Sequence, residues 1–186
     1  KDCEITLEAN PGAADYARFS AYREAGINRL SIGVQSFSNR YLQELGRIHN
    51  ADEAVDAFAA ARDAGFDNIN IDLMHSLPKQ HADGSTDDLE QAIALGPEHI
   101  SWYQLTIEPN TVFYSQTPSL PDEDSSYDIF SRGLHQLHEA GYQQYEVSAF
   151  ARAKRRARHN MNYWQFGDFM GIGAGAHGKL TCLDGS

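Results

Sequence analysis

The stretch that decides the fold of this chain runs from Ala51 to Met74 and reads ADEAVDAFAAARDAGFDNINIDLM. Through Ala64 it spaces its apolar residues as an amphipathic helix does, and Gly65 then ends the helix. The second part, Asn68–Met74, is rich in isoleucine and other aliphatic residues and predicts a strand. A helix that ends at glycine and leads within a few residues into an apolar strand is typical of stacked units in a parallel α/β sheet.

The same junction recurs along the chain, at Ala25-Gly26, Ala64-Gly65, Leu95-Gly96 and Ala140-Gly141. The predicted strands are Glu4–Asn10, Arg29–Gln35, Asn68–Met74, Ile100–Thr106, Tyr145–Phe150 and Met170–Ala174. The predicted helices are Ala13–Ala25, Asn39–Leu45, Ala51–Ala64, a helix capped by Ser85 or Thr86 that runs through Leu95, and Asp122–Ala140, with a long loop at Pro109–Pro121. This succession predicts an α/β fold with mostly parallel strands, as a barrel or partial barrel, and a doubly wound open sheet is the alternative.

The composition limits the classes of function. The chain has 186 residues and a formal net charge of −11, and this negative charge argues against general nucleic-acid binding. No apolar run is long enough to span a bilayer, and no signal peptide is visible. The two cysteines, Cys3 and Cys182, form no Cys-x-x-Cys pair, so we expect a cytoplasmic protein. Because the chain begins at Lys1 and stops soon after a strand-like segment, we expect it to be part of a larger protein.

Polar residues gather where the predicted strands end. Glu8, Gln35, Asp72, Gln104 and Thr106 all lie in the last residues of a strand. Each residue alone can be explained as a helix cap or a buried hydrogen-bonding residue. Polar residues near the ends of four strands nevertheless favour one shared site, because ligands bind at the carboxyl ends of parallel strands. Such a site would suit a ligand with hydroxyl and amino groups.

A second group of signals lies in the stretch from His159 to Lys179, which reads HNMNYWQFGDFMGIGAGAHGK. His159 is followed within two helical turns by Tyr163 and Trp164, and a glycine-dense run then carries His177. Aromatic faces beside a histidine could hold a flat, metal-bearing ligand, since imidazole is the commonest metal ligand. The alternative is a tight strand-to-turn corner with buried aromatic residues.

Several of these stretches resemble a known family. Glu8-Ala9-Asn10-Pro11, RLSIGVQSF at 29–37, LGRIH at 45–49 and NIDLM at 70–74 with Leu77-Pro78 resemble radical S-adenosylmethionine (SAM) proteins of the oxygen-independent coproporphyrinogen oxidase class. SWYQLTIEPNT at 101–111, His159-Asn160-x-x-Tyr163-Trp164 and GAGAHG at 173–178 are similar to the heme-chaperone branch of that class. The resemblance covers nearly the whole chain in collinear order, and the motifs are specific when taken together.

The resemblance implies a partial (β/α) barrel that carries SAM across its strand ends. Five positions of this chain match SAM-binding positions of the family: Glu8, Gln35, Arg47, Asp72 and Thr106. Carboxylates and an amide suit ribose hydroxyls and the amino group, and arginine suits the carboxylate of that ligand.

The resemblance also implies a heme site. The matching residues are His159, Asn160, Tyr163 and Trp164, with His177 as a second candidate. The basic stretch Arg152–Arg158 just before them is either a solvated loop or, through Arg155, Arg156 and Arg158, a partner for heme propionates. The implied partners are heme and the hemoproteins that receive it, and we expect any contact with a membrane to be made through a recipient.

The chain departs from the family in one respect that matters for catalysis. Family members carry an N-terminal Cys-x-x-x-Cys-x-x-Cys motif for a [4Fe–4S] cluster, and this chain has none. Cys3 and Cys182 cannot replace it, because a cluster needs at least three thiolates from a compact loop. Residues 1–186 thus correspond to the central and C-terminal part of one barrel, without the cluster segment or the family's C-terminal domain. We expect no catalysis by this chain alone, and the missing first strands predict an unpaired sheet edge that favours aggregation or a homodimer.

Two functions follow from the resemblance. The first is a heme-binding chaperone that delivers heme to hemoproteins, with SAM binding in the intact family. The alternative is an oxygen-independent coproporphyrinogen III oxidase, a radical SAM enzyme that performs decarboxylations in porphyrin biosynthesis. The stretch His159–Trp164, together with the Gly-Ala-His-Gly sequence that ends at Gly178, favours the chaperone, because the oxidase branch generally lacks both.

Overall fold

The computed structural model describes residues 3–12, 18–174 and 176–182. Within them the elements are β1 (Thr6–Ala9), α2 (Phe19–Glu24), β2 (Arg29–Gln35), α3 (Asn39–Glu44), α4 (Ala51–Asp63), β3 (Ile69–His75), α5 (Ala82–Leu95), β4 (His99–Gln104), α6 (Val112–Ser115), α7 (Glu123–Glu139), β5 (Gln143–Glu146), β6 (Ala149–Ala151) and α8 (Arg158–Trp164). No helix among the described residues is both long and apolar enough to cross a membrane.

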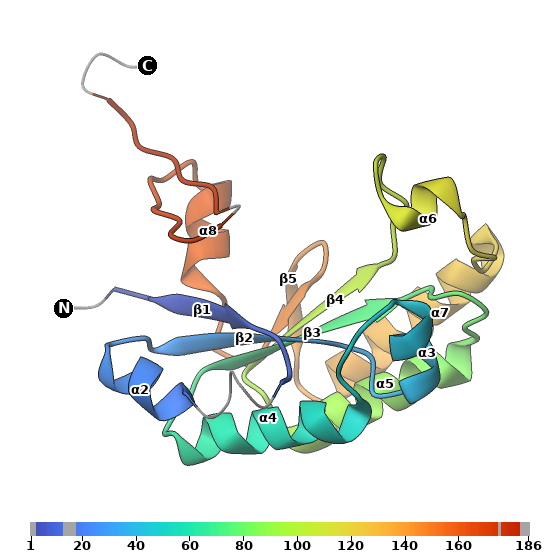
Figure 1. Ribbon diagram of the computed structural model, residues 1–186, viewed down its shortest axis with the longest axis horizontal. Coiled ribbons are helices and arrows are strands. Elements are labelled where there is room, and N and C mark those ends of the chain that lie inside the picture. Colours follow the sequence, from blue (N-terminus) through green and yellow to red (C-terminus); the bar gives the residue numbers. More distant parts are fainter. Residues whose placement is uncertain (1–2, 13–17, 175, 183–186) are drawn as a thin grey trace.

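The strands form one sheet in the order β1-β2-β3-β4-β6-β5 (Figure 1). The first four strands are parallel to one another. Strand β6 then pairs antiparallel with β4, and β5 pairs antiparallel with β6. The structure therefore confirms an α/β fold with a mostly parallel sheet.

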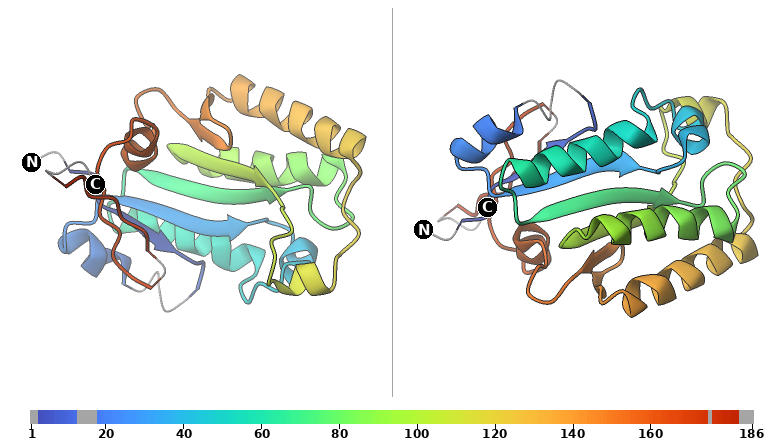
Figure 2. Two further views of the ribbon diagram at one scale, coloured as in Figure 1. Left: turned by 90° about the horizontal axis from the view of Figure 1, so that it is seen from above. Right: turned by 90° about the horizontal axis from the view of Figure 1, so that it is seen from below.

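The two faces of the sheet differ. Helices α2, α4, α5 and α7 cover one face, whereas the view from above leaves the strands largely uncovered (Figure 2). On this open face, α8 rises at the end where β1 and β2 begin, and α6 rises at the opposite end (Figure 1). A doubly wound sheet carries helices on both faces, so helices on one face agree with the partial barrel and not with the doubly wound alternative.

The period-two alternation of the strands separates the core from the open face. On the covered face β2 buries Leu30, Ile32 and Val34, and the neighbouring strands continue this layer with Ile71 and Trp102. Burying each aliphatic side chain of this kind stabilises the fold by about 1.5–3 kcal/mol. The residues between them in each strand point to the open face, and these are mostly polar.

The predicted helix–glycine–strand junctions are present. Gly65 adopts a φ of +85°, and the glycines at the other three junctions also have positive φ. Only glycine reaches this region without strain, so it lets each helix end and the chain turn into the next strand. Helix α4 begins at a capping box between Asn50 and Glu53, and Asp122 caps α7 by accepting a hydrogen bond from the Ser125 backbone.

The fourth predicted helix begins earlier than its sequence suggested. Helix α5 starts at Ala82, so Ser85 and Thr86 lie inside it and do not cap it. The Thr86 hydroxyl instead donates to the carbonyl oxygen of Asp83 within the helix. Asp88 of this helix is buried, and its carboxylate accepts hydrogen bonds from the Phe37 backbone and the Ser36 hydroxyl. Long-range contacts of this kind are not visible in a local pattern.

The C-terminal third contains three further corrections. The predicted strand Tyr145–Phe150 is two strands, β5 and β6, because the chain reverses between them and a short turn can only join antiparallel neighbours. The predicted strand Met170–Ala174 is absent from the described residues, where this region forms only an isolated bridge between Phe169 and Lys179. The loop Pro109–Pro121 contains the short helix α6. Of the helix predicted at Ala13–Ala25, residues 13–17 lie outside the described residues.

Candidate functional site

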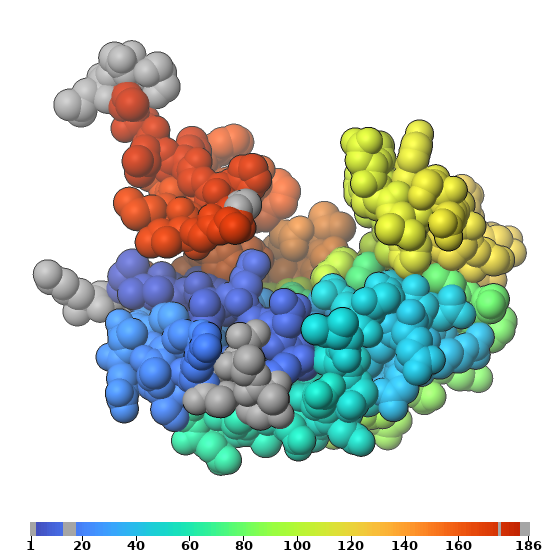
Figure 3. All heavy atoms as spheres, in the orientation of Figure 1, coloured from blue at the N-terminus to red at the C-terminus, as the bar shows by residue number. Residues whose placement is uncertain are grey.

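A cavity of about 550 Å³ lies on the open face of the sheet. Its lining residues come from β1 to β4, the turn after β1, and α8: Glu8, Ala9, Asn10, Arg29, Ser31, Gly33, Gln35, Asn70, Asp72, Ser101, Tyr103, His159 and Asn160. Figure 3 shows the surface hollowed between the segment that contains α8 and the segment around α6. Because most of the lining side chains are polar, the cavity suits a ligand with hydroxyl, amino or carboxylate groups.

The register of the parallel strands brings these side chains together. Ser31 pairs with Asn70 across β2 and β3, and Asn70 pairs with His99 across β3 and β4. One step further along, Asp72 pairs with Ser101. Side chains at paired positions lie on the same face of neighbouring strands, so these residues form a connected polar surface.

The carboxyl end of β2 has an unusual backbone. Gln35 adopts a φ of +68°, which costs a non-glycine residue of order 1 kcal/mol and is common at functional sites. The Tyr103 hydroxyl donates a hydrogen bond of 2.8 Å to the Gln35 side-chain oxygen. A Cβ atom at Gly33 would lie 2.9 Å from the Gln35 amide nitrogen and 3.2 Å from the Asn10 oxygen. Gly33 therefore leaves the space that the Gln35 and Asn10 side chains occupy.

The five residues that match SAM-binding positions fall into two groups. Glu8, Gln35 and Asp72 line the cavity together. Arg47 and Thr106 are exposed and do not line it. Gln104, which we also expected at this rim, is exposed and lies outside the lining as well.

Arg47 and Thr106, the two positions outside the cavity lining, interact with different parts of the structure. The pKa of Tyr103 is raised by burial and by the charge of Asp72, and the positive charge of Arg47 opposes this rise. The Arg47 guanidinium therefore acts electrostatically on the cavity although it does not line it. The Thr106 hydroxyl donates to Glu108 within its own loop.

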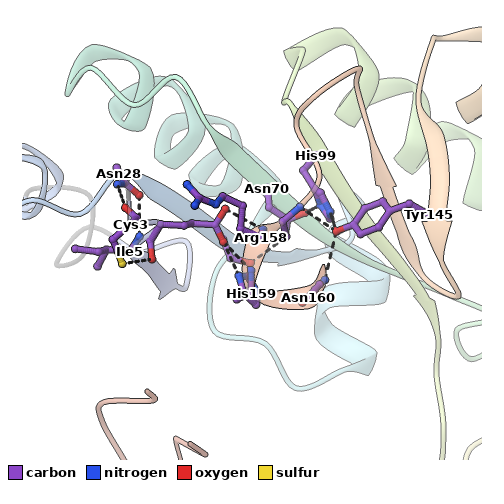
Figure 4. A network of polar contacts seen from close by, with 12 residues as sticks. Cys3, Ile5, Asn28, Asn70, His99, Tyr145, Arg158, His159 and Asn160 are labelled. Atoms are coloured by element: carbon purple, nitrogen blue, oxygen red, sulfur yellow. Dashed lines mark hydrogen bonds and ion pairs between the residues drawn. The ribbon is translucent and has the colours of Figure 1, made fainter. Parts of the chain in front are cut away.

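A series of hydrogen bonds crosses the open face from α8 to Asp72. Figure 4 shows its part from Asn160 through Tyr145 and His99 to Asn70. The Asn160 amide donates to the Tyr145 hydroxyl at 3.4 Å, and this hydroxyl lies 2.7 Å from His99 Nε2. His99 Nδ1 lies 2.5 Å from the Asn70 oxygen, and the Asn70 amide donates to Asp72 at 2.8 Å. Since an amide oxygen only accepts, His99 carries its hydrogen on Nδ1 and accepts from Tyr145 on Nε2. Every donor in this series of hydrogen bonds therefore points toward the Asp72 carboxylate.

His99 is neutral in this arrangement. Burial lowers the pKa of His99 to about 3, and the positive charge of Arg29 acts in the same direction. Arg29 is only 2% exposed, and burial lowers its pKa, while the acidic groups around it, Glu4 first, raise it. Arg29 therefore supplies the positive charge that the carboxylates of this face require.

Helix α8 is held onto the sheet by Glu4, which lies just before β1. The Glu4 carboxylate accepts hydrogen bonds from the backbone nitrogens of Arg158 and His159 at 3.0 and 3.1 Å, and it lies 2.9 Å from His159 Nδ1. Burial would raise the pKa of Glu4, but these hydrogen bonds lower it to about 2. His159 therefore lies where β1 begins, at the amino ends of the parallel strands, whereas the polar site was expected at their carboxyl ends.

Tyr145 provides the second attachment of α8, because its hydroxyl also accepts a hydrogen bond from the Ala157 backbone. We expect Tyr145→Phe to lower the free energy of unfolding by about 2 kcal/mol, since it leaves buried hydrogen-bonding groups of His99 and Ala157 without a partner. Hydrogen exchange of the α8 backbone, measured with chemical denaturation, checks this. Tyr127→Phe, at an exposed position of α7, serves as the control. Unchanged exchange in α8 would contradict the role of Tyr145.

The aromatic residues after His159 are exposed, which excludes the alternative of a corner with buried aromatics. Tyr163 and Trp164 are 58% and 56% exposed, and their rings meet edge to face with centroids 5.5 Å apart. Further exposed apolar residues follow. Together they form what we call the C-terminal apolar surface: Tyr163, Trp164, Phe166, Met170, Ile172 and Leu180. Exposed apolar residues gathered in one segment indicate a binding surface.

His177 does not reach the cavity. It is exposed and belongs to no strand, and the strand predicted just before it, Met170–Ala174, is not formed. The glycine run around it serves close backbone packing, since a Cβ at Gly171 would lie 2.2 Å from the His177 carbonyl oxygen. Gly175 of this run lies outside the described residues.

The basic stretch before α8 is partly engaged by the protein itself. Arg155 lies 3.8 Å from Asp67, and the Arg156 guanidinium lies over the Tyr145 ring at 5.5 Å from its centroid. Both contacts join the stretch to the amino end of the sheet. These two side chains therefore contact the fold, although Arg152, Lys154, Arg156 and Arg158 are exposed.

The residues present do not fit an iron–sulfur cluster. Cys3 and Cys182 are both free and exposed. In the described ranges, no three His, Cys, Asp or Glu side chains lie close enough together to hold a metal ion.

Several residues of the site were missed from the sequence: Glu4, Arg29, Asn70, His99 and Tyr145. A signal for three of them exists, because Arg29, Asn70 and His99 occupy strand positions whose side chains alternate away from the core. Glu4 and Tyr145 carry no such signal, since their partners in α8 are distant in the sequence.

Comparison with known proteins identifies the family. The family model of the radical SAM superfamily matches residues 1–89. The heme chaperone HemW of Haemophilus influenzae is 58% identical over 96% of this chain and 46% of its own length, and HemW of Escherichia coli is 56% identical over 99% of the chain and 49% of its length. The chain thus spans about half the length of the curated relatives it matches.

A solved structure shares the fold. Coproporphyrinogen III oxidase (HemN) of Escherichia coli, described as a radical SAM enzyme, superimposes with a TM-score of 0.80 at 25% identity over 95% of this chain and 44% of the HemN chain. The mostly parallel sheet, the matched family model and the relatives agree. The chain therefore belongs to the radical SAM superfamily, among the relatives of HemW.

Proposed function

We propose that this chain is part of a HemW-type heme chaperone, which binds heme at α8 and delivers it to recipient hemoproteins. The observation that carries the proposal is the half-exposed His159, 47% exposed at its side chain, which adjoins the C-terminal apolar surface. The HemW names of relatives at 44–58% identity support it. Heme is the cargo in this proposal, and the recipient proteins are its partners.

The residues around α8 fit heme in two respects. His159 Nε2 makes no hydrogen bond to any residue that the structure describes, so it is available to an iron. The exposed rings of Tyr163 and Trp164 offer apolar faces beside it, as a porphyrin requires. Asn160 instead anchors the helix through Tyr145, so we assign it to positioning. His177, which lies outside the cavity lining, remains the second candidate ligand.

SAM binding on the open face is part of the same proposal. Glu8 and Asp72 can accept hydrogen bonds from ribose hydroxyls or an amino group, and Gln35 adds an amide. Arg47 can pair with the carboxylate of the ligand from the edge of the cavity. The polar lining of the cavity supports this assignment, whereas Thr106 has less support because it is exposed and bonded to Glu108.

The alternative function is an oxygen-independent coproporphyrinogen III oxidase, supported by the superposition on HemN. We favour the chaperone because the HemW relatives are far more similar in sequence than HemN is. We further propose that the chain is the central and C-terminal part of the barrel. A cytoplasmic location suits its two free thiols. A homodimer could form through β1, because among the described residues this strand ends the sheet order and has one unpaired edge.

A hemin titration followed by Soret absorbance tests the proposal. We expect saturable binding to the 186-residue chain and at least about tenfold weaker binding in His159→Ala, because the iron loses its ligand. His135→Ala, at an exposed position of α7, is the matched control and should bind as the parent does. His177→Ala decides the second candidate. An absence of saturable binding, or equal affinity in His159→Ala, would refute the heme site proposed here.

A further inference from the structure

We propose that Glu4 is a positioning residue for the heme-binding histidine, because its buried carboxylate sets the tautomer of His159 and presents Nε2 to the iron. This inference rests on the function proposed for His159, but its first test needs no heme. Glu4 lies outside every sequence motif that we singled out for heme or SAM.

The geometry around Glu4 is specific. One carboxylate oxygen lies 2.9 Å from His159 Nδ1 and 3.1 Å from the His159 backbone nitrogen, and the other accepts from the Arg158 backbone nitrogen at 3.0 Å. The Glu4 side chain is only 9% exposed, whereas the His159 side chain is 47% exposed. A nearly buried acceptor thus holds Nδ1 of an imidazole that is itself half-exposed.

The chemistry of the two groups determines the tautomer. An ionised carboxylate can only accept hydrogen bonds, so His159 must carry a hydrogen on Nδ1. In the neutral ring this leaves the lone pair on Nε2, which is the atom available for a metal. Histidines that bind metals commonly donate their second N–H to a carboxylate, which orients the ring and increases its basicity. The Glu4–His159 pair has this arrangement before any iron is present.

The attachment of α8 can be separated from the orientation of the ring. The Tyr145 hydroxyl also holds this helix, because it accepts hydrogen bonds from the Ala157 backbone and the Asn160 side chain. Loss of the Glu4 carboxylate therefore leaves one attachment of α8 in place. The ring of His159, in contrast, has no other hydrogen-bond acceptor at Nδ1 among the described residues.

The first experiment records the imidazole nitrogen signals of His159 by NMR in the chain labelled with ¹⁵N-histidine, without heme. We expect the Nδ1–H tautomer in the parent chain and a mixture with substantial Nε2–H in Glu4→Ala. Glu24→Gln, an exposed glutamate of α2, is the control and should leave the signals unchanged. An Nε2–H tautomer in the parent, or unchanged signals in Glu4→Ala, would overturn the inference.

The second experiment measures hemin affinity and the midpoint potential of the bound heme. Glu4→Ala should bind hemin at least about tenfold more weakly. Glu4→Gln keeps an oxygen that can accept from Nδ1 but lacks the charge, so its affinity should recover most of that loss while its potential rises above that of the parent. A purely helix-capping role would leave the potential of Glu4→Gln unchanged, and that result would also overturn the inference.

The two proposals fail in different ways. If the parent chain does not bind hemin, the proposed function fails, and the tautomer measurement still decides whether Glu4 orients His159. If hemin binds through His159 but the Glu4 variants change neither tautomer nor potential, the inference fails and the proposed function stands.

Discussion

Gly133→Val is expected to lower the free energy of unfolding by about 3 kcal/mol, because α7 packs against β4 at this position without space for a side chain. A Cβ atom at Gly133 would lie 2.0 Å from Cη2 of Trp102. Trp102 cannot move away easily, since it is 1% exposed and lies between two other rings. Its ring centroid is 5.9 Å from that of Phe130, on which it stacks, and 4.3 Å from that of His75. Urea denaturation followed by circular dichroism measures the change.

The control for this substitution is Ser131→Val, at an exposed position of the same helix. It introduces the same β-branched residue into α7 and therefore reports the loss of helix propensity alone, which is within about 0.7 kcal/mol. Equal effects of the two substitutions would show that the close packing of α7 on Trp102 contributes nothing to stability.

Acidification from pH 7.5 to 5.0 is expected to lower the free energy of unfolding by on the order of 2 to 3 kcal/mol. Two buried histidines lower it by about 4 kcal/mol, and the buried carboxyl of Asp88, whose pKa burial raises to about 6, offsets about 1 kcal/mol of this because it takes up its proton in the folded state. Burial, together with the positive charge of Arg29, lowers the pKa of His99 to about 3, and burial lowers the pKa of His75 to about 4. Both groups are nearly inaccessible to solvent, so screening by water reduces the effect little.

The sign follows from proton uptake. Between these folded-state pKa values and the unfolded value of about 6.5, the unfolded chain binds more protons than the folded chain. The stabilisation by the two histidines is therefore complete above pH 6.5 and is lost as the pH falls to their folded-state values, about 4 for His75 and about 3 for His99. Glu4 acts in the same direction at lower pH, because its pKa is lowered to about 2 and its contribution disappears as the pH falls below its ordinary value.

Denaturation curves of the parent chain and His99→Gln, each at pH 7.5 and 5.0, test this prediction. Glutamine can donate toward Asn70 and accept from Tyr145 but does not titrate in this range. We expect the difference between the two pH values to shrink by about 2 kcal/mol in the variant, because His99 no longer contributes and only the opposing terms of His75 and Asp88 remain. A pH difference of the same size in His99→Gln would assign the acid sensitivity to other groups.

The order of elements and the core were determined by local sequence. Strand β2 lies at Arg29–Gln35 as predicted, and α4 begins at Ala51 as predicted, because alternation, helical spacing and a terminal glycine act over a few residues. The gathering of Glu8, Gln35 and Asp72 in one cavity also follows from sequence, since residues late in adjacent parallel strands must be neighbours. The resemblance to the radical SAM family added the chemical identity of the ligand they are proposed to bind.

Contacts between residues far apart in the chain could be decided only by the tertiary structure. Glu4 and His159 are separated by 155 positions, and Tyr145 and His99 by 46, yet each pair is hydrogen-bonded. Whether a histidine faces solvent, a carboxylate or a hydroxyl depends on which elements pack against it, and no local pattern records that. The sequence by itself thus determined a parallel α/β sheet with a polar rim and a histidine–aromatic helix. The tertiary structure decided that this helix lies at the amino ends of the strands, where a buried carboxylate orients its histidine.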